Sequence, residues 1–353
     1  MGSRILPERQ LPPEQLDHYL ALGYRVAGQA IYTSEYIKLG LDSLVSVLPT
    51  RLPLSDLSLS RHLRKCKRKN QARFTASVGP ARLDMHEEQV LNRRYLYEKP
   101  EKAVQDLGFH VFGRRVIAPL LRTWQTRVYD GKRLVATSYF DLGMEGAYSK
   151  QGIYDPAYSK YSLGLYTLIL EMEFCRWAGK RWFYPGYIGV ETDLFDYKLK
   201  LSDTMSYFDF RSQQWLPFAG KENLPKPLED MQNKLEELSR YLATMGIPSR
   251  VRRYLYGDVR YSLRLEADHY LDGPYLLELL VGARPMVVTY ELTGTHPFGL
   301  LELEHRYAAQ EHPKYLMAQD TYDHVSRIRD RIHYSTNAKS MAFFIGQVIS
   351  HSN

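Results

Sequence analysis

The stretch 154–187 contains a helix start with the character of an anion site. A polar, turn-rich segment leads into Ser162-Leu163-Gly164, and a long apolar-periodic helix is predicted to follow. The first amides of a helix have no partners inside it and the macrodipole is positive at that end, so such a start binds phosphates and other anions. An ordinary crossover helix with a serine cap fits the same residues, because a short motif with one glycine is weak. The local pattern leaves both interpretations open.

A second candidate is the run of positive charge in SLSRHLRKCKRKN, residues 58–70. Ser58 or Ser60 is a suitable N-cap for a helix here. No acidic residue is interleaved, and like charges at this density repel one another unless an anion neutralises them. A solvated charged face is the alternative to contact with a nucleic-acid backbone, which we favour. The basic residues are Arg61, Arg64, Lys65, Lys67, Arg68 and Lys69.

The elements that must position these residues alternate along the chain. Asp130-Gly131 between two apolar runs is typical of a β-hairpin, and Gly179 is expected to end the long helix. Tyrosine and apolar residues predict strands at 124–129, 133–140, 147–153, 182–187 and 207–210. Helices are predicted at 84–98, 162–178, 192–201, 228–242 and 321–332, with strand-like runs and turns at 257–258 and 293–294 between the last two. The order predicts an α+β fold with a mixed sheet and flanking helices.

Composition is that of a globular protein with room for about two domains of ~150 residues. The chain has 353 residues, 44% of them hydrophobic, and a formal net charge of +7, which makes a polyanionic partner plausible. Two cysteines, Cys66 and Cys175, exclude a disulfide framework and a cysteine-rich metal site. No apolar run approaches the ~18 residues of a membrane span, and the N-terminus lacks the apolar core of a secretory signal, so a cytoplasmic location is expected.

The order of elements resembles the GCN5-related N-acyltransferase fold. Four stretches resemble the arginyl-tRNA–protein transferases and their bacterial leucyl-transferring relatives. They are residues 58–70, YDGKRLVA (129–136), YDPAYSKYSLGLY (154–166) and YPGYIGVETDLFDYK (184–198). The resemblance implies an N-terminal family-specific region at 1–100, an acyltransferase-like domain at 101–218 and a C-terminal extension of unknown role at 219–353.

The resemblance implies an enzyme of the N-degron type, which transfers arginine or leucine from a charged tRNA to the N-terminal amine of an acceptor protein. No cofactor is expected, because the aminoacyl-tRNA ester is itself the activated donor. The basic run would hold tRNA phosphates. Asp155 would pair with an ammonium group, although a turn residue before proline is more often structural. Tyr187 and Lys198 would line the aminoacyl pocket, and the tRNA 3′ end would be bound at Ser162, Leu163, Gly164, Leu165 and Tyr166.

The chain departs from the family pattern in its N-terminal part. Family members usually carry a cysteine cluster, associated with metal or iron–sulfur binding, where this chain has IYTSEYIKLGLDSLVSVLPTR, residues 31–51. Without cysteine there, we expect no metal and a replacement by packing of Leu41, Leu44, Val45 and Val47.

Two other functions fit part of the pattern. An acyl-CoA N-acetyltransferase normally has a Gly-x-Gly/Ala pair before the helix, whereas this chain has Gly164 alone. A non-catalytic relative that binds tRNA or peptide would bind tRNA regardless of charging, with strong salt dependence.

Overall fold

The structure is a computed structural model. It describes residues 4–5, 11–28, 30–39, 43–55, 57–100, 104–113, 121–254, 270–281, 284–308, 321–322 and 324–352. The chain divides into two compact units. The larger unit takes in 6–32 and 48–223, and the C-terminal unit takes in 1–5, 33–47 and 224–353.

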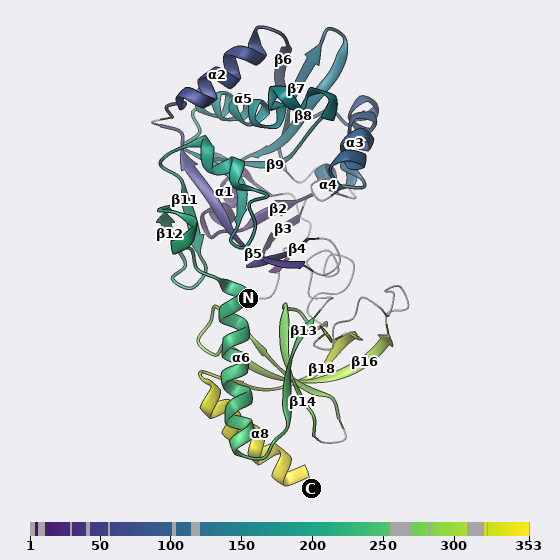
Figure 1. The fold of residues 1–353 in the computed structure, drawn as a ribbon, viewed down its shortest axis with the longest axis vertical. Helices are drawn as coiled ribbons and strands as arrows, with labels where there is room; N and C mark the ends of the chain where they lie inside the picture. Colours follow the sequence, from purple (N-terminus) through teal and green to yellow (C-terminus); the bar gives the residue numbers. More distant parts are fainter. Residues whose placement is uncertain are drawn as a thin grey trace. The chain divides into compact units, whose positions relative to one another are not determined.

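A mixed sheet forms the centre of the larger unit (Figure 1). Its strand order is β12-β11-β5-β10-β9-β8-β7-β6. In chain order these strands are β5 (Ser43–Pro53), β6 (Thr75–Pro80), β7 (Thr123–Asp130), β8 (Arg133–Leu142), β9 (Gly146–Tyr154), β10 (Trp182–Gly189), β11 (Ser206–Asp209) and β12 (Gln214–Pro217). The predicted hairpin is confirmed: β7 and β8 are antiparallel and meet at Gly131, whose φ is +59°. β6 to β9 form an antiparallel meander, and β10 then runs parallel to β9.

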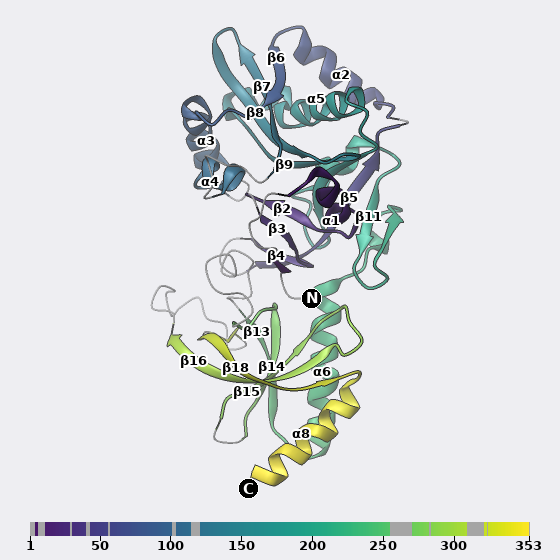
Figure 2. The same cartoon turned by 180° about the vertical axis from the view of Figure 1, so that it is seen from behind.

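Helices cover both faces of this sheet, as Figure 1 and, from behind, Figure 2 show. α2 and α5 pack on one face, against Val135 and Phe140 of β8, while α3 and α4 pack on the other, against Leu134 and Tyr139. Successive residues of a strand point to opposite faces, so β8 is buried on both sides. The prediction of an α+β fold with a mixed sheet and flanking helices is confirmed. The helices are α2 (Arg61–Gln71), α3 (His86–Glu98), α4 (Leu107–Phe112) and α5 (Leu163–Trp177).

Smaller elements complete the larger unit. Near the N-terminus are α1 (Pro13–Ala21) and the antiparallel pair β2 (Arg25–Ala27) and β3 (Ala30–Thr33). Short 3₁₀ helices are η1 (Pro156–Tyr161), η2 (Asp196–Leu201) and η3 (Lys221–Asn223). The helix predicted at 192–201 is therefore only a 3₁₀ turn over its second half.

Strands β9 and β10 pair over a short length. Only residues 146–148 pair with 182–184, although β9 continues to Tyr154 and β10 to Gly189. Pro185 follows the last pair and has no backbone N–H, and Gly186 then takes a φ of +98°, which a residue with a side chain rarely adopts. The two strands are connected through α5, so the start of that helix follows the free part of β9.

The C-terminal unit is built on its own sheet, with strand order β17-β13-β14-β15-β16-β18. These strands are β13 (Ser249–Tyr254), β14 (Tyr275–Leu279), β15 (Met286–Tyr290), β16 (Phe298–Ala308), β17 (Thr321–Tyr322) and β18 (His324–Ser335). α6 (Pro227–Thr244) and α8 (Ala338–Ser352) share a core with one face of the sheet. β1 (Arg4–Ile5) and β4 (Tyr36–Leu39) also belong to this unit, and β4 pairs with the first half of β5.

The helix predicted at 321–332 is wrong, because these residues form β17 and most of β18. β18 pairs with β16 along its length, with register shifts at which the pairing skips Ile332 and Arg329 of β18. Ile328 and Ile332 therefore pack on opposite faces of the sheet. In the sequence, their spacing of four residues is typical of one face of a helix. Only the pairing with β16 shows that the segment is a strand. The turn at 293–294 joins β15 and β16 as predicted, and the one at 257–258 lies outside the described residues.

Candidate functional site

The basic run forms α2, and its charges point mainly to solvent. The Ser60 hydroxyl caps the helix by accepting from the Leu63 amide at 3.3 Å. Leu63, Cys66 and Asn70 are the buried side of the helix. Lys67 is tied to Glu173 of α5 by an ion pair of 2.5 Å. The remaining basic side chains of the run are exposed, and they are Arg61, Arg64, Lys65, Arg68 and Lys69.

The start of α5 has an unusual backbone. Ser162 occupies the N-cap position with φ +54° and ψ +46°, in the left-handed region, and its hydroxyl makes no capping hydrogen bond. Its carbonyl accepts from the amides of Leu165 and Tyr166, each at 3.0 Å. Leu163 and Gly164 come first in the helix, and such amides have no acceptor within it. The side chains of Leu163, Leu165 and Tyr166 are buried in the core, so these residues can meet a ligand only through their backbone groups, whereas Ser162 is exposed.

Side-chain hydrogen bonds join α2 to the segment just before α5. The Asn70 side-chain amide donates to the Tyr161 carbonyl at 2.9 Å. The Lys69 ammonium donates to the Lys160 carbonyl at 2.8 Å and lies 4.8 Å from the centroid of the Tyr161 ring. The structure thus brings together the basic run and the helix start, which are about ninety residues apart in the sequence.

Asp155 lies at the N-cap of η1 and is almost fully buried. Its carboxylate accepts from the Ala157 amide at 3.1 Å and forms ion pairs with Arg94, at 3.2 Å, and with Arg133. Two guanidinium groups already neutralise this carboxylate, which favours the structural alternative for Asp155. It anchors η1 to β8 and α3.

Tyr187 and Lys198 are in direct contact. The Lys198 ammonium donates to the Tyr187 carbonyl at 3.0 Å and lies 4.8 Å from the centroid of the Tyr187 ring. The approach depends on Gly186, because a Cβ at that position would lie 3.1 Å from the Lys198 Nζ. Lys198 is 8% exposed, so the ammonium lines the interior rather than the surface.

Arg25, which the sequence did not indicate, packs on the same tyrosine. Its guanidinium carbon lies 4.7 Å from the centroid of the Tyr187 ring and 4.9 Å from that of Tyr32. Tyr148 of β9 is buried beside them, and burial raises the pKa of its hydroxyl, an effect that Arg25 opposes. The rings of Tyr32, Tyr148 and Tyr187 and the cations Arg25 and Lys198 therefore lie close to the point where β9 and β10 stop pairing. No sequence signal would have found Arg25, because its neighbours come from β3, β9 and β10.

Glu171 is the other residue that sequence reasoning missed. It lies on α5 and is fully buried, and burial raises the pKa of its carboxyl to about 8. The hydroxyls of Ser138 on β8 and Ser149 on β9 lie beside it and act in the opposite direction on its pKa. The available signal was an acidic residue in register with the buried Leu168 and Cys175 of the same helix.

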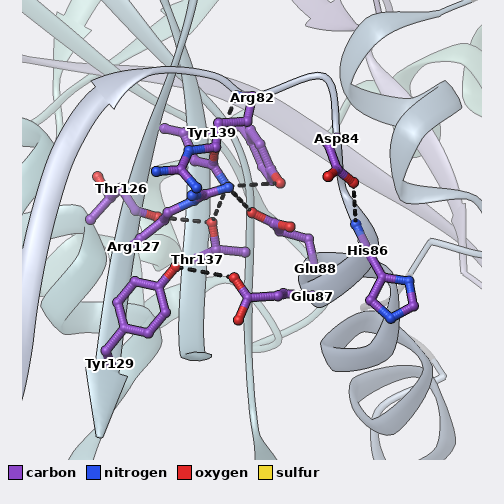
Figure 3. A network of polar contacts seen from close by, with 11 residues as sticks. Arg82, Asp84, His86, Glu87, Glu88, Thr126, Arg127, Tyr129, Thr137 and Tyr139 are labelled. Carbon is purple, nitrogen blue, oxygen red and sulfur yellow. Dashed lines mark hydrogen bonds and ion pairs between the residues drawn. The ribbon is translucent and has the colours of Figure 1, made fainter. Parts of the chain in front are cut away.

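A separate polar network fixes α3 to the sheet (Figure 3). Glu88 of α3 forms a buried ion pair with Arg127 of β7 at 2.5 Å and accepts from the Gln125 amide at 2.7 Å. Gln125 also donates to the hydroxyls of Thr137 and Tyr139, at 3.0 and 3.1 Å. The network connects α3 to β7 and β8 through side chains, which explains how α3 is held.

Two further features concern metals and membranes. Within the described residues no group of three or more His, Cys, Asp or Glu side chains is arranged to hold a metal ion. Of the four residues expected to pack in place of the cysteines, Val45 and Val47 are buried, Leu44 is half-buried, and Leu41 lies outside the described residues. In the part of the chain that the structure describes, no helix is long and apolar enough to cross a membrane.

Comparison with protein families gives one match. Residues 73–207 match the family described as "Arginine-tRNA-protein transferase, C terminus". The matched segment contains the meander, η1, α5, β10 and η2, and it begins just after α2.

Among characterised relatives, the chain is similar to bacterial proteins named "Aspartate/glutamate leucyltransferase". The protein of Vibrio cholerae is 27% identical over 203 residues, which is 56% of this chain and 82% of the relative. That of Vibrio vulnificus is 26% identical over 186 residues, or 51% of this chain and 75% of the relative.

Solved structures give weaker likenesses. The C-terminal domain of a putative lysylphosphatidylglycerol synthetase from Agrobacterium fabrum is 16% identical, with a TM-score of 0.33 over 50% of this chain and 52% of that one. The L-PGS of Bacillus licheniformis is 17% identical, with a TM-score of 0.35 over 53% of this chain and 61% of that one.

Proposed function

Because this chain is a divergent member of the arginine-tRNA-protein transferase family, we propose that it transfers an amino acid from an aminoacyl-tRNA to the N-terminal amine of an acceptor protein. The donor is the ester at the tRNA 3′ end. The acceptor is a protein or peptide with a free N-terminus, and the relatives' name suggests an acidic first residue.

The contact between α2 and the start of α5 is the observation that carries the proposal. Exposed arginines and lysines of α2 provide a surface for the tRNA backbone, whose phosphates supply affinity through counterion release. Asn70 and Lys69 hold that surface against the segment before α5, where the first amides of the helix suit a phosphate of the 3′ end. The basic surface of α2, which suits the tRNA backbone, thus adjoins the start of α5, which suits a single phosphate.

The chemistry required is acyl transfer from an ester to an amine. The amine attacks the ester carbonyl, the C–N bond forms, and the ribose oxygen leaves. The ester is already activated, so the protein has to position the two reactants, stabilise the oxyanion and remove a proton. No covalent enzyme intermediate is needed.

We assign Tyr187 and Lys198 to the aminoacyl pocket, beside the parting of β9 and β10. The ammonium of Lys198 faces the ring and the carbonyl of Tyr187, and it lies 5.2 Å from the centroid of the Phe195 ring. A preorganised cation in a largely buried setting stabilises negative charge more than it would in water. Lys198 is therefore suited either to the developing oxyanion or to an acidic acceptor side chain.

A transfer assay tests the proposal. Arginyl-, leucyl- and lysyl-tRNA carrying a radiolabelled amino acid are each incubated with peptides that begin with Asp, Glu, Leu or Lys. The expected result is label on the acidic peptides from arginyl- or leucyl-tRNA, and the donor that works identifies the amino acid. Absence of transfer from every charged tRNA contradicts the proposal.

Charge reversal on α2 tests the donor surface. The double variant Arg64→Glu/Lys65→Glu is expected to lose most tRNA affinity, because the protein then repels the phosphates. The matched control is Arg240→Glu/Lys339→Glu, which changes the same charge at exposed positions of α6 and α8. Unchanged tRNA affinity in the α2 variant would contradict the assignment of the basic run to the donor site.

A further inference from the structure

Arg51 of β5 is in contact with two indole rings. Its guanidinium carbon lies 4.1 Å from the centroid of the Trp182 ring and 4.4 Å from that of Trp215. The Trp215 indole is itself held in place, because its N–H donates to the Ala21 carbonyl at 2.7 Å. Aromatic rings stack on the flat face of a guanidinium, and its N–H donors lie in the plane of the group. The two rings therefore fix the orientation of the Arg51 donors.

A second arginine approaches the same ring. The guanidinium carbon of Arg181 lies 5.5 Å from the centroid of the Trp182 ring, and Arg181 is exposed whereas Arg51 is half-buried. Burial lowers the pKa of the Arg51 guanidinium, Tyr184 acts in the opposite direction, and the charge of Arg181 lowers the pKa further. The two positive charges are thus close enough to repel each other.

Neither arginine has an acidic partner. In the part of the chain that the structure describes, no carboxylate forms an ion pair with Arg51 or Arg181, and the Arg51 Nε is buried without an acceptor. The nearby Asp17 accepts instead from the Glu145 and Gly146 amides, at 2.8 and 2.9 Å. A guanidinium stays charged in a protein, and a partly buried charge is costly unless it is paired. An anion from outside the chain would supply the missing negative charge.

This pair of arginines lies across the sheet from the basic run. Leu52 of β5 and Phe183 of β10 pack in the core that α2 and α5 share. Because successive residues of a strand point to opposite faces, Arg51 and Trp182 point to the other side. There Trp182 and Trp215 pack on the core around α1. The site is therefore separate from the start of α5.

We propose that Arg51 and Arg181 together bind a phosphate group beside Trp182. A phosphate presents enough oxygens to accept from two guanidinium groups at once, whereas a carboxylate fits the fork of one. Because the indole rings already hold Arg51, binding costs little of its side-chain entropy. A free phosphate and the backbone of an RNA share this chemistry. The site goes beyond the proposed transfer and does not depend on it.

Tryptophan fluorescence reports on the site directly. The chain has four tryptophans, and two of them contact Arg51. In the full-length variant Trp124→Phe/Trp177→Phe only these two remain. Titration with inorganic phosphate, against chloride at constant ionic strength, is expected to give a saturable change in emission with a Kd of about 1 mM or lower. Calorimetric titration of wild type measures the same Kd and does not depend on the folding of the double variant.

Two substitutions test the two arginines by calorimetry. Arg181→Gln removes the exposed guanidinium and leaves the contacts of Arg51 with the indoles, and it is expected to weaken phosphate binding about 10–100-fold. Arg51→Lys keeps the charge but loses the planar fork, so a similar loss is expected. The matched control is Arg240→Gln, at an exposed position of α6, which is expected to bind phosphate as wild type does.

Three results would overturn the proposal. The first is the absence of saturable phosphate binding to wild type. The second is an Arg181→Gln variant that binds phosphate as tightly as wild type. The third is acetate that binds as tightly as phosphate, because the site would then not select a phosphate group.

Uncharged tRNA separates the two sources of phosphate. If saturating tRNA abolishes phosphate binding and Arg181→Gln weakens tRNA binding, the site holds a phosphate of the RNA backbone. If phosphate binds equally well with tRNA present, the site takes a free phosphate. Both results support the phosphate site. None of these measurements requires turnover, so a failure of the transfer assay would contradict the proposed function and leave this inference standing.

Discussion

The side-chain amide of Asn70 donates at 2.9 Å to the carbonyl of Tyr161, the last residue of η1. The same amide nitrogen donates at 2.9 Å to the Cys66 carbonyl within α2. One buried side chain thus connects the end of the basic helix to the backbone that leads into α5. The donor surface and the helix start depend on this connection to keep their relative position.

Asn70→Ala is expected to destabilise the fold by ~1–3 kcal/mol, because it leaves a buried carbonyl without its donor. It is also expected to weaken tRNA binding, since α2 loses its attachment to η1. Urea unfolding and tRNA titration measure the two effects.

The control for this variant is Asn92→Ala, which removes a comparable buried bond, from Asn92 to the Val104 carbonyl at 2.8 Å, on α3. Equal loss of tRNA affinity in both variants at equal loss of stability contradicts a specific role of Asn70.

Gly186→Ala is expected to displace Lys198. The new methyl would lie 3.1 Å from the Lys198 Nζ, and the φ of +98° is strained for any residue with a side chain. We expect a loss of stability of roughly 1–2 kcal/mol from the backbone alone and a larger loss of transfer activity from the shifted ammonium.

Gly179→Ala separates the two causes. Gly179 also has a positive φ, +72°, but a Cβ there meets nothing within 4 Å. Its variant is expected to lose stability without losing activity per folded molecule. If Gly186→Ala also loses stability without losing activity per folded molecule, the contact between Gly186 and Lys198 does not contribute to activity.

Glu171 predicts a pH dependence of stability. Its pKa is raised from 4.5 to about 8 in the folded protein, so between these values the folded state binds more protons than the unfolded chain. Stability contributed by this group therefore falls as pH rises through that window, by roughly 4–5 kcal/mol in total. Glu171→Gln removes this slope.

The free energy of unfolding, measured for wild type and variant from about pH 5 to pH 9, gives the difference curve. We expect the variant to gain on wild type steadily as pH rises and to be the more stable protein at the alkaline end. Parallel curves would show that the carboxyl titrates as it does in water.

Lys150 and Asp141 form a fully buried ion pair, with 2.8 Å between Nζ and Oδ2. The ammonium also donates to the carbonyls of Gly28 and Val111, so it joins β9 to the turn after β2 and to α4. Lys150→Met is expected to cost ~3–5 kcal/mol, because it leaves Asp141 buried and unpaired.

A double-mutant cycle with Asp141→Asn measures the coupling. The double variant is expected to be more stable than Lys150→Met alone, since the unpaired charge is gone. Additive losses contradict a direct interaction between the two side chains.

Local signals predicted the part of the fold that depends on neighbouring residues. Asp130-Gly131 defines its hairpin and Gly179 ends α5, because both act through backbone conformations that few residues adopt. The strand at 324–335 was missed because its pairing with β16, far away in sequence, overrides an apolar spacing typical of a helix.

The same distinction applies to the candidate site. The basic run and the start of α5 were visible as local composition, and Tyr187 and Lys198 came from a resemblance. Arg25 and Glu171 were not predicted, because each matters only through neighbours on other strands: Tyr187 and Tyr32 for one, Ser138 and Ser149 for the other.

Pro185 affects the free-energy cost of binding a ligand between β9 and β10. Because Pro185 cannot donate a backbone hydrogen bond at the point where β9 and β10 stop pairing, the ladder of backbone hydrogen bonds between the two parallel strands does not continue past that point. The separation of the two strands is therefore part of the folded structure itself. It does not require a conformational change when a ligand binds. A ligand that binds between the separated strands would not have to break backbone hydrogen bonds of the sheet. Its binding free energy would therefore not be reduced by that cost, which is the advantage of a preorganised site.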